Sequence, residues 1–135
     1  MKGFGDLYKS ENKLKKKSKL TREKIINKAI QFHFQGNIQE AKKNYEYCIN
    51  QGFKDHRVFS NYGAILQGLG NLEESEKFFT KAIEINPNFP EGLNNLGNIS
   101  RDLGKLKKAE SLYRKAIKLR PSYADAYSNL GNLSR

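Results

Sequence analysis

LNNLGNISRDLGKLKKAESLYRKAIKLRP, residues 93–121, is the stretch that decides the fold. From Leu93, apolar or small residues follow the i, i+3, i+4, i+7 spacing that marks one face of an α-helix. The same spacing begins again at Ala109. Gly104 lies between the two stripes and can adopt the left-handed conformation that ends a helix, while Pro121 stops the second segment. The stretch therefore predicts a helix–turn–helix.

This unit repeats along the chain with a period of 34 residues and no insertion. Agreement between independent columns makes chance a poor explanation for one period. Asn37 and Asn71, each followed three residues later by Glu, have the spacing of a capping box at the start of second helices. Ser122 with Asp125 has similar spacing, whereas Lys105 has none. The columns include Gly36, Gly70 and Gly104; Gly63, Gly97 and Gly131; Tyr45, Phe79 and Tyr113; and Cys48, Ala82 and Ala116.

These residues resemble the tetratricopeptide repeat, in which a large apolar residue, Leu-Gly, Ala, an aromatic residue and Pro recur at fixed offsets. Leu96-Gly97, Ala109, Tyr113 and Pro121 match that pattern. The resemblance implies an all-α fold, a right-handed α-solenoid of stacked helix–turn–helix units. The first unit is degenerate, with Lys28-Ala29 in the Leu-Gly place and Phe53 in the Pro place. The expected division is a leader at 1–21, repeats at 22–55, 56–89 and 90–123, and a last helix at 124–135.

The leader and the last helix each leave two interpretations open. Residues 1–21 hold seven Lys against Asp6 and Glu11, so we expect either a disordered solubilising tail or a basic segment with a specific anionic partner. The last helix is either a polar cap or the first half of a further repeat.

A finer resemblance concerns larger enzymes. Residues 95–132 are similar to the superhelical arm of O-linked N-acetylglucosamine transferases, and the leader is similar to the start of marine cyanobacterial tetratricopeptide proteins. The alternative function implied is a substrate-recruiting arm of a sulfotransferase, methyltransferase or glycosyltransferase. No catalytic domain is contained in the 135 residues.

An asparagine recurs once per unit on the first helices, opposite the core stripe. Asn is a mediocre helix former, so four at one position need a reason. A column of amides can grip the backbone of an extended peptide, because an amide both donates and accepts hydrogen bonds. The resemblance implies that this face lines a concave groove; the alternative is a helix–helix contact inherited by duplication. The predicted peptide-binding residues are Asn27, Asn61, Asn95 and Asn129, extended by Asn98 and Asn132.

Other functions are disfavoured. The carboxylate clamp of chaperone-binding relatives would need basic residues at Glu91 and Asn95. One Cys and two His, none with a partner at useful spacing, predict no enzyme, metal site or cofactor, and Cys48 takes a buried small-residue place. The absence of long apolar runs predicts no membrane span and a cytoplasmic protein whose partner is a protein or peptide. Nucleic acid is a weaker possibility that rests on the basic leader alone.

Overall fold

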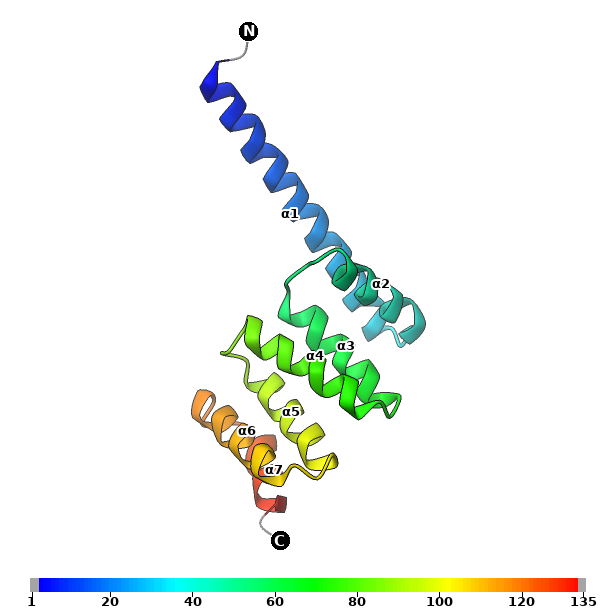
Figure 1. The fold of residues 1–135 in the computed structure, drawn as a ribbon, viewed down its shortest axis with the longest axis vertical. Coiled ribbons are helices and arrows are strands. Elements are labelled where there is room, and N and C mark those ends of the chain that lie inside the picture. The colour runs from blue at the N-terminus through cyan, green and yellow to red at the C-terminus, as the bar shows by residue number, and fades with distance from the viewer. Residues whose placement is uncertain (1–2, 134–135) are drawn as a thin grey trace. The chain divides into compact units, whose positions relative to one another are not determined.

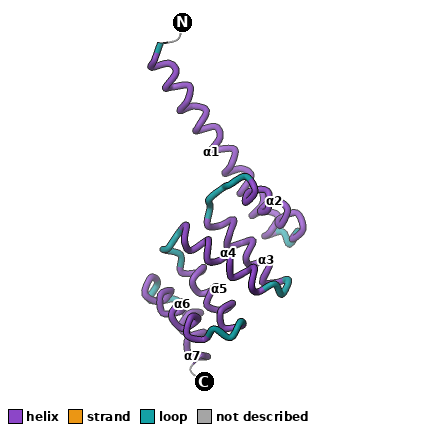
Figure 2. The backbone as a smooth tube through the Cα atoms, viewed as in Figure 1, coloured by secondary structure: helices purple, strands orange, loops and turns teal. Residues whose placement is uncertain are grey.

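A computed structural model describes residues 3–133, and within them every regular element is an α-helix (Figures 1 and 2). The all-α prediction is confirmed over that range. The chain divides into two compact units, residues 1–53 and 54–135. None of the helices in residues 3–133 combines the length and the apolar character needed to span a bilayer.

The first unit is a helical hairpin made of α1 (Phe4–Phe34) and α2 (Ile38–Asn50). Its core lies at the C-terminal end of α1, where Ile26 and Ala29 are buried, and along α2, where Tyr45 and Cys48 are fully buried. Cys48 thus occupies the small buried place that the period assigned to it. His33 of α1 lies 3.1 Å from the Tyr45 hydroxyl, measured from its Nδ1, and so packs within the hairpin.

The leader differs from the expectation of a disordered tail. Residues 4–21 form the exposed first half of α1 and run without a break into the packed half, while Met1 and Lys2 lie outside the described residues. The physical reason is composition: Lys, Glu and Leu are good helix formers, and no Pro interrupts them. Elongation from an already packed helix also avoids the cost of nucleation.

The second unit consists of two hairpins and a closing helix. The hairpins are α3 (His56–Gly68) with α4 (Leu72–Ile85), and α5 (Pro90–Asp102) with α6 (Leu106–Leu119). The last helix, α7 (Ala124–Leu133), packs on α6 and touches α5, while α4 packs on α5. Each hairpin thus covers an apolar face of the next, as stacking of repeats requires. The shared core is Phe79, Leu93, Leu96, Ile99, Leu112, Ala116 and Ala126.

The turns between helices agree with the period, but the caps agree only in part. Gly36, Gly70 and Gly104 have φ of 78°, 81° and 80°, the left-handed conformation that favours glycine. The Asn37 side chain accepts a long hydrogen bond of 3.5 Å from the Glu40 N–H.

The other predicted caps are wrong. Asn71 makes no side-chain cap bond, and Ser122 lies two residues before the first residue of α7. Asp55, which no capping box marks, caps α3 instead: its carboxylate accepts from the Arg57 N–H at 2.9 Å.

Two helical glycines let aromatic rings approach the backbone. A Cβ built on Gly63 would lie 2.8 Å from the Phe79 ring, and one on Gly97 would lie 2.5 Å from the Tyr113 ring. Contacts this short require a neighbour to move. In both hairpins of the second unit, an aromatic ring of the second helix therefore fills the space that a side chain on the first helix would otherwise occupy.

Candidate functional site

The predicted asparagines lie on α1, α3, α5 and α7, the first helix of each expected repeat. In the second unit, Asn61 is on α3, Asn95 on α5 and Asn129 on α7, one per repeat. Asn27 lies on α1 of the first unit, where it is exposed. Asn61, Asn95 and Asn129 are all half-buried. All four positions therefore keep some contact with solvent.

Two members of the column have amides that are not engaged within the protein. Across residues 3–133, the side-chain amides of Asn61 and Asn95 have no hydrogen-bond partner. Neither amide is enclosed away from water, and each carries two donors and an acceptor. These two side chains can therefore bond a ligand without breaking an internal contact.

Asn129 differs, because its amide takes part in the contact between α5 and α7. Its Nδ2 donates to Oδ1 of Asn94 at 3.0 Å. Asn94 is 5% exposed and is the polar residue that sequence reasoning missed. A signal for it exists in the same period, since Ser60 and Ser128 stand 34 residues to either side. The position recurs as a polar one in the second unit.

Asn98 and Asn132, the two residues predicted to extend the column, differ in their contacts and exposure. The Tyr113 hydroxyl donates to Oδ1 of Asn98 at 2.6 Å, which leaves the amide nitrogen of Asn98 to donate elsewhere. Burial raises the pKa of Tyr113 above its usual value, so this hydroxyl remains a neutral donor near pH 7. Asn132 is exposed near the end of α7.

The charge around this face is not that of a carboxylate-binding clamp. Glu91, in a place where the clamp requires a base, forms an ion pair with Arg120, whose guanidinium lies 5.0 Å from the centroid of the Tyr123 ring. Burial on its own raises the pKa of Glu91, but the backbone hydrogen bond and Arg120 outweigh it and hold the pKa below its ordinary value. Glu91 therefore remains a carboxylate near pH 7, paired with Arg120, where the clamp would carry a base.

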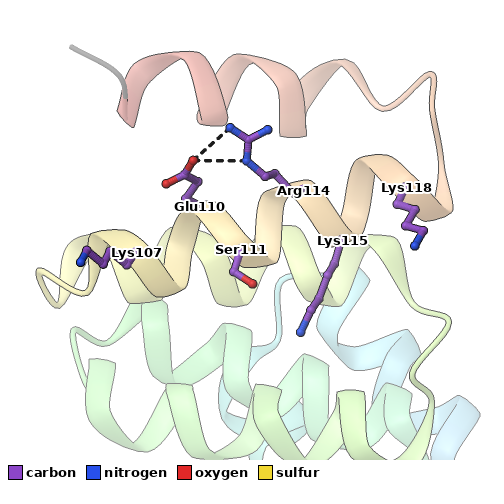
Figure 3. Close-up of a pocket in the computed structure, with 6 residues that line it drawn as sticks. All are labelled: Lys107, Glu110, Ser111, Arg114, Lys115 and Lys118. Atoms are coloured by element: carbon purple, nitrogen blue, oxygen red, sulfur yellow. Dashed lines mark hydrogen bonds and ion pairs between the residues drawn. The ribbon is translucent and has the colours of Figure 1, made fainter.

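The second helices present a different surface. On α4, Glu76 accepts from Lys105 at 2.7 Å and from Lys108 at 3.1 Å, which ties the start of α6 to α4. Further along α6 lies a depression of about 390 Å³. Figure 3 shows Glu110 paired with Arg114 there, and Lys115 and Lys118 extending from the other side of α6. The depression is lined by Lys107, Glu110, Ser111, Arg114, Lys115 and Lys118.

The histidines and acidic residues form no metal centre in the part of the chain that the structure describes. No group of three or more His, Cys, Asp or Glu side chains in residues 3–133 is arranged to hold an ion. His56, the first residue of α3, packs edge-on against the ring of Phe89, which directly precedes α5; the ring centroids are 4.9 Å apart. Both described histidines thus make aromatic contacts.

Comparison with known protein families identifies the repeats. One family model described as TPR repeat matches residues 97–133, and two described as tetratricopeptide repeat match residues 78–111 and 56–89. No curated protein is similar enough in sequence to count as a relative.

Solved structures agree in fold. The first TPR domain of Spaghetti (RPAP3), bound to the HSP90 peptide SRMEEVD, is 19% identical with a TM-score of 0.77; the match covers 84% of this chain and 90% of that one. The second TPR domain of human RPAP3, in complex with the HSP70 peptide SGPTIEEVD, is 21% identical with a TM-score of 0.73, covering 81% and 91%. MamA is 16% identical with a TM-score of 0.78, covering 98% and 84%.

Proposed function

Because residues 56–133 are tetratricopeptide repeats, we propose that this chain is a protein-interaction module that binds an extended peptide segment along its first helices. The observation that carries the proposal is the pair of unengaged amides at Asn61 and Asn95, one repeat apart on α3 and α5. An amide can both donate to a peptide carbonyl and accept from a peptide N–H. Side chains at this repeat position would then hold a backbone without reading its sequence.

The peptides in the two RPAP3 structures both end in Glu-Glu-Val-Asp and support a peptide-binding function for the fold. We propose a different peptide class for this chain. Glu91 stands where a clamp would carry a base, and Asn95 stands where it would carry an arginine. The ligand is therefore neutral or basic where it passes α5, and its main chain supplies the contacts.

Two amide contacts can be tested with one double variant. We expect Asn61→Ala/Asn95→Ala to bind a peptide selected on the wild type about tenfold or more weakly, since each lost hydrogen bond is worth about 1 kcal/mol. The peptide would come from a displayed library of random sequences, and its affinity would be measured by fluorescence polarisation. Asn129 is left intact because its loss would also break the contact with Asn94.

The matched control variant also replaces two asparagines with alanine, but at positions outside the column. Asn12→Ala/Asn50→Ala alters two side chains of the first unit outside the column and should bind normally. Equal affinity of the Asn61→Ala/Asn95→Ala variant and the wild type for every selected peptide would refute amide recognition. The finer resemblance to cyanobacterial proteins and transferase arms stays a prediction, as does the cytoplasmic location; a reading frame that continues into a catalytic domain would test the transferase alternative.

A further inference from the structure

A second groove lies on the opposite helices of the second unit, between α4 and α6. It has a volume of about 480 Å³, and its floor is made by Leu93 and Leu96 of α5 with Leu112 of α6. Ile83 of α4 and Leu119 of α6 form apolar parts of its walls. None of the predicted asparagines lines it, so this groove is separate from the face proposed above.

The two walls of the groove carry different charges. Glu84 stands on the α4 wall, and Lys115 and Lys118 stand on the α6 wall. The stretch 105–120 as a whole holds seven Lys and Arg against the single acid Glu110. An occupant with acidic groups is therefore attracted to the α6 side of the groove and repelled from Glu84.

The two lysines that border the groove differ from those at the start of α6 in their ion pairing. At the start of α6, Lys105 and Lys108 are both paired with Glu76. In the described residues, by contrast, Lys115 and Lys118 are exposed and make no ion pair or hydrogen bond. Figure 3 shows both side chains extending away from the Glu110–Arg114 pair. Two cations with no internal partner therefore border an apolar floor.

We propose that this groove binds an acidic, apolar segment of another protein, with its apolar side chains on the leucine floor and its carboxylates against Lys115 and Lys118. The α6 wall runs from Leu112 to Leu119, about 10 Å at the helical rise. That length holds about three residues of extended peptide and is shorter than a long acyl chain. A peptide segment therefore fits the groove better than a fatty acid.

The leader of a second copy of this chain is a poor occupant. The leader of such a copy carries exposed apolar residues, among them Phe4, Leu7 and Tyr8, but it holds seven Lys against two acids. Such a segment would bring positive charge to the basic α6 wall. Charge complementarity instead selects a partner whose apolar side chains are flanked by Asp or Glu.

The test is a selection of random displayed peptides on the full chain, followed by affinity measurements on synthetic copies. We expect one class of selected peptides to combine Leu, Ile, Phe or Met with Asp or Glu. For this class, Lys115→Glu/Lys118→Glu should weaken binding about tenfold or more, and raised salt should weaken binding to the wild type. Leu119→Ala should also weaken binding, because it removes apolar wall area.

Two control variants separate this groove from net charge and from the asparagine face. Lys13→Glu/Lys16→Glu changes the net charge equally on exposed residues of the leader and should leave binding unchanged. Asn61→Ala/Asn95→Ala should also leave it unchanged, so either proposal can fail alone. Circular dichroism melts would show that each variant is folded.

Three results would overturn the proposal: no acidic, apolar class among the selected peptides; equal affinity of such peptides for the wild type and for Lys115→Glu/Lys118→Glu; or an equal loss in the leader variant. A selected class lost only in Asn61→Ala/Asn95→Ala would assign peptide binding to the first helices and leave the α4–α6 groove without a role.

Discussion

Gly97→Ala adds one methyl group where the Tyr113 ring of α6 lies against the backbone of α5. The new Cβ would lie 2.5 Å from Cε1 of Tyr113, 2.8 Å from its Cδ1 and 3.1 Å from its Cζ. Tyr113 is fully buried, and its hydroxyl donates to Asn98 at 2.6 Å. The ring therefore cannot move away without losing either its packing or its hydrogen bond.

The expected free energy combines three terms of known sign. Alanine is a better helix former than glycine, which favours the variant by about 1 kcal/mol. Overpacking of a filled core costs about 1–3 kcal/mol, and loss of the Tyr113 hydrogen bond costs about 1 kcal/mol more. The gain in helix propensity and the loss of the hydrogen bond offset each other, so the net destabilisation is about 1–3 kcal/mol. For a unit of this size each kcal/mol lowers Tm by about 4–8 °C.

Urea and thermal unfolding followed by circular dichroism would measure the effect, with two other glycines for comparison. Gly131 holds the same repeat position on α7, but its Cβ would meet nothing within 4 Å, so Gly131→Ala should be neutral or slightly stabilising. Gly63→Ala should fall between, since its closest contact is 2.8 Å and the Phe79 ring carries no hydroxyl to lose. Equal stability of Gly97→Ala and Gly131→Ala would refute the reasoning.

Three further substitutions probe the packing, the cap and the buried amide. Ala116 is fully buried, so Ala116→Leu should lower the free energy of unfolding by about 1–3 kcal/mol; an unchanged melt would contradict the assigned core. Burial would raise the pKa of Asp55, but Arg57 outweighs it and holds the pKa below 3.8. At neutral pH the free energy of unfolding of the wild type should therefore exceed that of Asp55→Asn by about 1 kcal/mol or less. This difference should disappear as the pH falls through the pKa of Asp55 in the folded protein. A difference that persists in acid would show that the ion pair is not its cause. Asn94→Ala removes the hydrogen-bond partner of Asn129, so α7 amides should exchange hydrogen faster and the free energy of unfolding should fall by about 1 kcal/mol; unaltered exchange in α7 would show that the contact is unimportant.

The helices, their turns and their close contacts follow from the 34-residue period. Gly104 predicted a left-handed turn and has φ of 80°, and Gly63 and Gly97, which share one column of the repeat, both lie against an aromatic ring. These features are predictable because they depend on residues a few positions apart, or on one position repeated in each unit. Spacing alone carries that information.

The leader and the caps were less predictable, for two physical reasons. Residues 4–21 lack an apolar stripe, and their helix depends on propensity and on continuation from Ile26 and Ala29, which a periodicity argument does not weigh. Caps depend on one hydrogen bond with narrow geometry. Asn71 has the right spacing but no such bond, while Asp55 bonds Arg57 without a capping box.

The α4–α6 groove was also absent from the sequence argument. It combines Ile83, Leu93 and Leu119 from three helices, so no single stripe contains it. The basic character of α6 was visible in the sequence, but which lysines are paired was not. Glu76 bonds Lys105 and Lys108 across the helix pair, and only coordinates separate these from Lys115 and Lys118.

The asparagine column has two explanations, and the contacts of the second unit distinguish them. If duplication of a helix contact explained the column, each Asn would bond the residue that precedes the matching Asn one repeat earlier. Asn129 does so with Asn94. The matching residue for Asn95 is Ser60, whose hydroxyl donates to the Arg57 carbonyl instead.

For Asn61 the matching residue is Ile26, whose side chain has no acceptor at all. The helix contact therefore accounts for Asn129 alone, and two half-buried amides one repeat apart are left without an internal partner. Because Asn also lowers helix propensity at both positions, these two amides support the proposal that the column binds a peptide main chain.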